Sequence, residues 1–224
     1  MTIADTDAAI DTDRLDSIHD FLILLDRFKT IERRNYLTDA SRRETDAEHT
    51  WHMAVYALLL RDELGFEADL TRTLCLILVH DLVEIYAGDT FAYDDAALAG
   101  QAERENEAAA RLFSTLPDDL RDRVDGWWRE FEEGATPEAR FARALDRLQA
   151  FTQNVVSGGR SWRENGVTKN RTFMRMDEAL KADPAIRYLV EKGYDRADRE
   201  RSWAGQSPNQ SSNQSSISGS DSAT

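Results

Sequence analysis

The segment from Ala68 to Ala87 restricts the fold more than any other part of the chain. As a helix it would be apolar on nearly all sides, and such a helix belongs in the centre of a bundle. Its longest purely apolar stretch, Leu74 to Val79, is far too short to span a bilayer. The pair His80-Asp81 follows directly, where an unpaired charge is costly without a metal ion or another partner. The segment therefore predicts an interior helix that carries a polar site.

The rest of the chain indicates an all-α helical bundle. Apolar residues recur at helical spacing, and no segment alternates with a period of two, so we expect little or no strand. Gly65 and Gly88 are placed to end helices, and Thr136-Pro137 to begin one. The expected helices cover about 15–28, 46–64, 68–87, 101–116 and 119–131, with a further helix from Pro137.

The length of 224 residues favours one domain. Ser, Asn, Gln and Gly dominate from Gly205 onward, and such a composition buries too little apolar surface to offset its ordering entropy. We expect a flexible N-terminus over residues 1–13, a single domain over 14–204 and a disordered tail over 205–224.

The net charge of −14 argues against a nucleic-acid polymer or an anionic membrane as partner, because both need a broad basic surface. It leaves room for a small anion, for which the arginine pairs at 33–34 and 42–43 offer local positive charge. Solvated surface charge is an equally good interpretation of any single one of them. The one cysteine, Cys75, excludes an intrachain disulfide, and residues 1–13 lack the basic segment of a signal peptide. We therefore expect a cytoplasmic protein.

Two of the four histidines occur in a pattern typical of a metal site. His49 lies near the start of one expected helix, His80 and Asp81 lie in the next, and Asp146 lies within a later one. Distant helices that converge on one ion are how metal sites form in bundle cores. Imidazole and carboxylate ligands suit a divalent ion such as Zn²⁺, Mn²⁺, Co²⁺ or Fe²⁺. A lone helical histidine is more often a hydrogen-bonded core residue, so the prediction depends on the whole set.

Three segments resemble the HD superfamily of metal-dependent phosphohydrolases, and within it the branch that contains 5′-deoxynucleotidases. They are residues 48–54 (EHTWHMA), 80–90 (HDLVEIYAGDT) and 143–149 (RALDRLQ), and the resemblance extends over about residues 15–195. It implies an HD-domain bundle that binds one divalent ion through His49, His80, Asp81 and Asp146.

The same resemblance implies roles for four further residues. Glu84 and Asp89 correspond to the acids that serve the hydrolytic water and the leaving group, and Arg33 to a phosphate-binding arginine. The nucleotidases commonly have a tryptophan near that arginine, which helps to exclude ribonucleotides. This chain has Arg34, Asn35 and Tyr36 there instead, and Tyr36 is the only aromatic residue nearby that is able to crowd a 2′-hydroxyl.

The resemblance thus implies an enzyme that releases phosphate from nucleoside 5′-monophosphates, with deoxyribonucleotides preferred. Together with the tryptophan-rich segment 119–131, it also implies a homodimer. Another small phosphate ester is an alternative substrate. A non-catalytic metal-bound interaction domain is a further alternative, against which the intact acids Glu84 and Asp89 argue. A di-iron oxygenase of the same fold needs additional histidines, and only His52 is available between the first and last ligands.

Overall fold

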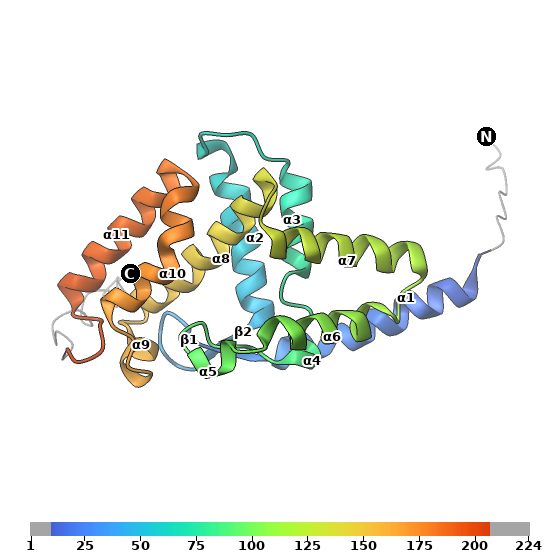
Figure 1. Cartoon of the computed structure of the whole chain (residues 1–224), viewed down its shortest axis with the longest axis horizontal. Helices are drawn as coiled ribbons and strands as arrows, with labels where there is room; N and C mark the ends of the chain where they lie inside the picture. Colours follow the sequence, from blue (N-terminus) through green and yellow to red (C-terminus); the bar gives the residue numbers. More distant parts are fainter. Residues whose placement is uncertain (1–9, 207–224) are drawn as a thin grey trace, which may run out of the picture.

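The computed structural model describes residues 10–206, and this part of the chain is predominantly helical (Figure 1). In chain order the elements are α1 (Thr12–Leu24), η1 (Leu25–Thr30), β1 (Glu32–Tyr36), β2 (Arg43–Thr45), α2 (Asp46–Leu60), η2 (Arg61–Glu63), α3 (Leu70–Val79), α4 (Glu84–Ala87), α5 (Asp95–Leu98), α6 (Gln101–Phe113), α7 (Asp118–Glu133), α8 (Pro137–Val156), α9 (Arg160–Glu164), α10 (Lys169–Ala182) and α11 (Pro184–Glu200). The expected all-α fold is confirmed.

The strands found among the described residues, β1 and β2, form one antiparallel hairpin. Glu32 pairs with Thr45 and Tyr36 with Arg43. The hairpin leads directly into α2. The amide of Asp46, at the start of that helix, bonds to the carbonyl of Ile31, the residue before β1. Across residues 10–206, the helices are too short or too polar to cross a membrane.

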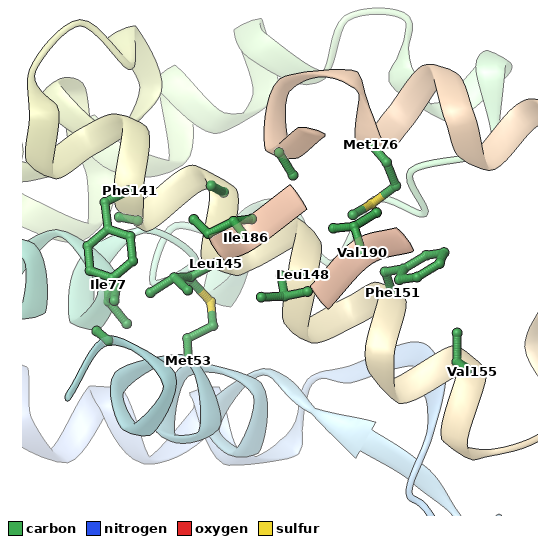
Figure 2. Close-up of a cluster of buried hydrophobic side chains, with 14 of the residues drawn as sticks. Met53, Ile77, Phe141, Leu145, Leu148, Phe151, Val155, Met176, Ile186 and Val190 are labelled. Atoms are coloured by element: carbon green, nitrogen blue, oxygen red, sulfur yellow. The ribbon is translucent and has the colours of Figure 1, made fainter. Parts of the chain in front are cut away.

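The first of two hydrophobic clusters surrounds α8, which runs between α2, α3, α10 and α11 (Figures 1 and 2). Met53 of α2, Ile77 of α3 and Ile186 of α11 meet Leu145 and Leu148 of α8, and all five are almost completely buried. Burial of one such side chain stabilises the fold by roughly 1.5–3 kcal/mol. This cluster therefore fixes the position of α8, which carries Asp146.

The second cluster lies beneath α1, η1, α4, α6 and α7. Its buried members include Phe21, Phe28, Val83, Leu112 and Trp128. The chain passes from the first cluster to the second at the end of α3, because Ile77 belongs to the first and Val79 to the second. The segment between α3 and α4 is thus the junction between the two clusters.

The expected continuous helix from Ala68 to Ala87 is wrong at this junction. α3 ends at Val79, and the amides of Leu82 and Glu84 bond to carbonyls only three residues back, as in a tight 3₁₀-like turn. A short helix, α4, follows and ends at Gly88, whose φ of +76° favours glycine. His80 and Asp81 therefore sit in a turn at the end of the central helix. The turn redirects the chain so that the residues after it pack in the second cluster.

Two further predictions from the sequence hold, and one falls largely outside the described residues. Thr136 caps α8 by accepting a hydrogen bond from the Ala139 amide, with Pro137 in the first turn. α2 ends near the expected place and continues as a 3₁₀ turn before Gly65. At the N-terminus, α1 begins at Thr12, inside the segment expected to be flexible. The predicted disordered tail lies outside the described residues from position 207 onward.

Candidate metal centre

Local signals at the start of α2 position the first predicted ligand. Thr45 caps the helix by accepting from the Glu48 amide, and the Glu48 carboxylate accepts from the Thr45 amide. The amide of Asp46 also bonds to the carbonyl of Ile31, which ties the helix start to the hairpin. His49 then lies in the first turn of a firmly anchored helix and is fully buried.

The four predicted ligands come together from α2, α8 and the turn between α3 and α4. His49 Nε2 lies 3.2 Å from Asp146 Oδ1 and 4.0 Å from Asp81 Oδ2. His80 Nε2 lies 2.9 Å from the same Asp81 oxygen. One ligand atom each from His49, His80 and Asp81 fall within 4.8 Å of one another. Side chains separated by up to 97 positions in the sequence thus surround one point.

Both imidazoles are oriented by a hydrogen bond at Nδ1. His80 Nδ1 lies 2.7 Å from the carbonyl oxygen of Ile77, which only accepts, so Nδ1 carries the hydrogen. His49 Nδ1 lies 2.6 Å from Gln149 Oε1, and the Gln149 amide nitrogen donates to Glu44 Oε1 at 2.7 Å. Each arrangement leaves a lone pair on Nε2 for a metal ion, as in metal-binding histidines generally.

The residues present fit a divalent ion. His80 Nε2 is buried and has no partner with hydrogen-bond geometry, which is costly for a polar atom unless it binds something else. Two imidazole nitrogens and two carboxylates are a donor set typical of Zn²⁺, Mn²⁺, Co²⁺ or Fe²⁺.

Opposite charges among the predicted ligands favour one another's ionised forms. Burial lowers the pKa of His80, but the adjacent Asp81 carboxylate more than offsets this and raises it to about 9. Burial disfavours ionised Asp81, yet His80 and then Arg33 hold its pKa below the usual range. Burial likewise opposes ionisation of Asp146, and His49 holds its pKa well below normal. A proton on His80 therefore competes with a divalent ion for the imidazole.

This proton gives a testable pH dependence. The pKa of His80 in the folded chain, about 9, lies above the ordinary value of 6.5. Its contribution to stability is therefore complete below pH 6.5 and is lost as the pH rises through 9. A divalent ion requires neutral imidazole, so it must displace that proton at low pH. We expect the increase in Tm on adding Mn²⁺ to be larger at pH 8.5 than at pH 6.5.

Differential scanning fluorimetry at fixed Mn²⁺ concentration measures this effect. His19→Gln is the control, because His19 is exposed on α1 and its loss should leave the trend unchanged. A metal-induced increase in Tm that does not vary between pH 6.5 and 8.5 would contradict the assignment of the proton to His80.

Gln149 offers a second prediction. Gln149→Leu removes the acceptor that orients His49, and loss of such a partner typically weakens metal affinity by about 10–100-fold. Competition with a chelator measures the affinity. Gln153→Leu is a matched control, because Gln153 is also buried, lies one turn further along α8 and bonds to the Tyr36 carbonyl instead. Equal losses of affinity in the two variants would assign Gln149 a structural role only.

A cluster of acids adjoins the ligand set. One carboxylate oxygen each from Asp46, Asp81 and Glu84 lie within 4.8 Å of one another. Burial, followed by the nearby Asp81 and Asp46, raises the pKa of Glu84 well above its usual range. Burial also raises the pKa of Asp46. Asp89 follows Gly88, and burial is the main cause that raises its pKa to about 6.

Arg33 lies among these acids. Its guanidinium Nη1 lies 2.8 Å from Asp81 Oδ2 and 3.2 Å from Asp46 Oδ1. Burial lowers the pKa of Arg33, but Asp81, Asp89 and the other surrounding carboxylates raise it well above normal. The guanidinium remains charged, and its buried Nε has no hydrogen-bond partner among the described residues.

A cavity of about 410 Å³ opens onto three of the predicted ligands, His80, Asp81 and Asp146, and onto the acids Glu84 and Asp89. Its walls include Arg33, Arg34 and Asn35, but not Tyr36. Tyr36 is directed toward α9, where its hydroxyl donates to Glu164. The prediction that Tyr36 contacts a substrate therefore receives no support from the geometry.

Sequence reasoning missed several residues of the site. Asp46 lies one turn before His49, and Gln149 one turn after Asp146, so helical spacing alone was able to point to both. Of the arginines on the opposite wall, Arg143 and Arg147 flank Asp146 on α8, whereas Arg175 gave no such signal, because it reaches the cavity from α10.

Comparisons with known proteins point to the same family as the sequence motifs. A family model described as HD domain matches residues 25–187. The chain is 30% identical over 138 residues to the human protein 5′-deoxynucleotidase HDDC2, an alignment that covers 61% of this chain and 66% of the human one. It is 28% identical over 142 residues to 5′-deoxynucleotidase hdd1 of Schizosaccharomyces pombe, which covers 61% of this chain and 70% of the yeast one. The chain thus spans slightly less than two thirds of the human relative.

Solved structures show the same architecture. A predicted metal-dependent phosphohydrolase from Magnetospirillum magnetotacticum MS-1 matches with a TM-score of 0.80 and 39% identity, over 85% of this chain and 96% of the other. The PH0347 protein of Pyrococcus horikoshii OT3 matches in fold, with a TM-score of 0.55 and 22% identity, over 80% of this chain and 98% of the other.

Proposed function

Because this chain belongs to the HD domain family, we propose that it is a metal-dependent phosphohydrolase that acts on phosphate monoesters. The observation that carries the proposal is the composition of one cavity. His80, Asp81 and Asp146 line it beside Arg33 and the acids Glu84 and Asp89, and the buried His49 lies 3.2 Å from Asp146. The neighbouring acids favour hydrolysis over a metal-bound interaction domain, which does not need them.

His49, His80, Asp81 and Asp146 would hold one divalent ion. Its chemistry when bound would be to polarise a phosphoryl oxygen and to lower the pKa of a bound water. One cluster of four ligands suits a single ion, and the chain supplies no additional buried histidine among residues 10–206 for a second.

The remaining polar residues provide phosphate binding and proton transfer. Arg33, charged and partly unpaired, is placed to bind phosphate oxygens and to balance charge as the ester bond breaks. Asp89 has a pKa of about 6, so it is ionised at pH 7.5 and is able to take a proton from the attacking water. Glu84, whose pKa burial and the nearby acids raise well above its usual range, is placed to hold a proton and give it to the departing 5′-oxygen.

We propose nucleoside 5′-monophosphates as the substrates, with deoxyribonucleotides preferred. The relatives named 5′-deoxynucleotidase support this choice. The cavity of about 410 Å³ lies within the usual range for small-ligand sites. Arg34 lines the cavity while Tyr36 does not, so no aromatic ring of this hairpin crowds a 2′-hydroxyl. We therefore expect the deoxy preference to be modest and base discrimination to be weak.

The test compares kcat/KM for dAMP, AMP and ribose 5-phosphate with Mn²⁺, Co²⁺ or Zn²⁺. We expect phosphate release from both nucleotides, faster from dAMP, and slower release from the sugar phosphate. Glu84→Gln purified in parallel controls for contaminating phosphatases. Equal rates on the two nucleotides would remove the deoxy preference. Faster turnover of ribose 5-phosphate would favour another small phosphate ester as the substrate.

We also propose that residues 14–204 form one domain in a cytoplasmic homodimer. Exposed apolar side chains on α2, Trp51 and Leu58, support an interface between copies, since such patches often mark contact surfaces. The tryptophan-rich helix α7 gives weaker support than the sequence implied, because Trp128 is buried against Phe113.

A further inference from the structure

Three arginines form the wall of the cavity beyond Asp146. Arg143 and Arg147 lie one turn apart on α8, and Arg175 projects from α10, which packs against α8. Arg175 Nη2 lies 3.7 Å from Asp146 Oδ2, whereas the other oxygen of Asp146 faces His49. This arginine wall, defined as Arg143, Arg147 and Arg175, is thus adjacent to the ligand set but lies outside it.

The arginine wall carries more positive charge than its surroundings balance. Glu178 accepts from Arg143 Nε at 2.9 Å and pairs with Arg147 Nη2 at 2.5 Å. Among residues 10–206, the only ion pair of Arg175 is the one with Asp146. Three guanidinium groups therefore share two carboxylates, and one of these, Asp146, is a predicted metal ligand.

Helix packing alone does not explain this excess. One arginine paired with Glu178 would suffice to link α8 and α10. Instead the Arg147 side chain is only 9% exposed, and its buried Nε has no partner. Buried like charges oppose folding, and an anion bound between them would remove that cost.

The arginine wall is separate from the phosphate site proposed at Arg33. Arg33 contacts Asp81 on the side of the ligand set that also holds Asp46, Glu84 and Asp89. The arginine wall contacts the set through Asp146. Two cationic groups thus flank the ligand set. Arg33 lies beside the acids suited to proton transfer, and the arginine wall lies on the side of Asp146.

Two further acids line the cavity, Glu105 of α6 and Glu132 of α7. Burial raises the pKa of both, which disfavours their charged forms. Arg143 donates to the backbone carbonyl of Glu132 at 2.9 Å. Glu132 also attracts Arg143 electrostatically, but the ion pairs of the arginine wall among residues 10–206 are those with Glu178 and Asp146.

We propose that the arginine wall binds a second phosphate group of the substrate, so that bisphosphorylated substrates are preferred over monophosphates. This inference rests on the proposed phosphohydrolase function. The reaction is the same hydrolysis: water adds to the phosphorus atom at the metal centre, and the phosphorus–oxygen ester bond breaks. The leaving oxygen takes a proton, and the second phosphate remains on the product.

Binding measured separately from turnover tests the inference. Calorimetry on Mn²⁺-loaded Glu84→Gln would compare deoxyadenosine 3′,5′-bisphosphate with dAMP, and ribose 1,5-bisphosphate with ribose 5-phosphate. The second phosphate should strengthen binding by about 10–100-fold, as expected for one or two charge-assisted hydrogen bonds. The scaffold with the larger increase identifies the substrate class, nucleotide or sugar.

A second substitution locates the effect. Adding Arg175→Gln should bring the ratio of the binding affinity for the bisphosphate to that for the monophosphate close to one. Arg175 is chosen because it is the most exposed member of the arginine wall. Lys181→Gln is the matched control: Lys181 is an exposed cation of α10 that pairs with Asp177 and does not line the cavity. It should leave the ratio unchanged.

The outcomes separate the two proposals. A ratio near one on both scaffolds without Arg175→Gln, or a high ratio that survives this substitution, would overturn the inference. If wild-type protein hydrolyses none of these esters but the ratio depends on Arg175, the arginine wall is a phosphate site and the proposed reaction fails. If hydrolysis occurs with a ratio near one, the reaction stands without the second site.

Discussion

Asp81→Ala is expected to remove the bound ion and to lower hydrolysis by at least about a thousandfold. The ion's stabilisation of transition-state charge is worth several kcal/mol, and each 1.36 kcal/mol corresponds to a factor of ten. Asp81 occupies the centre of the site, with one oxygen 2.9 Å from His80 Nε2 and 2.8 Å from Arg33. Its loss removes a ligand and also leaves Arg33 without its nearest carboxylate.

Metal content of the purified variant, measured by elemental analysis, is the direct readout. Asp183→Ala is a suitable comparison, because Asp183 is a buried carboxylate that caps α11 by accepting from the Ala185 amide. That variant should lower Tm and keep the ion. His80→Ala should behave like Asp81→Ala. Full metal stoichiometry in both ligand variants would show that the ion is held elsewhere.

Glu84→Gln is expected to keep the ion and to lose most turnover. General acid–base assistance contributes typically about a hundred- to ten-thousandfold, so kcat should fall by that factor. Because the pKa of Glu84 is raised, the protonated form acts as the acid, and the wild-type rate should fall as the pH rises through that pKa. The amide does not titrate, so this alkaline fall should be absent from the variant.

Steady-state kinetics from pH 5 to 9, together with metal analysis, tests this role. Glu105→Gln provides the comparison, because Glu105 lines the same cavity but lies outside the cluster of Asp46, Asp81 and Glu84. It should change kcat far less. An unchanged kcat and pH profile in Glu84→Gln would make Glu84 a purely structural acid.

The sequence predicted the fold class and four candidate ligands that the structure places close together, because α2, α3 and α8, which carry or precede them, pack in one core. It did not reveal the break after Val79. Whether an apolar helix continues depends on where its two ends pack, and here they pack in different clusters. The local pattern of apolar residues does not show in which cluster each end will pack.

The residues that contact the predicted ligands were harder to predict from the sequence, for a similar reason. Gln149 orients His49 across a separation of 100 residues, and Arg175 reaches Asp146 from a helix two elements further along the chain. Contacts of this kind depend on how α2, α8 and α10 pack, which helical periodicity does not specify. Tyr36 was overestimated because proximity in the sequence does not determine on which side of β1 a ring lies.

The position of the centre between the two hydrophobic clusters gives the ion a mechanical role. His49 and Asp146 belong to helices of the first cluster, whereas the chain after Asp81 enters the second. An ion bound by all of these residues would act as a cross-link between the two clusters and would oppose their separate local opening. The cavity has walls from both halves, α6 on one side and α8 on the other. Metal supply would then govern how long the cavity keeps its shape, as well as whether it contains a catalyst.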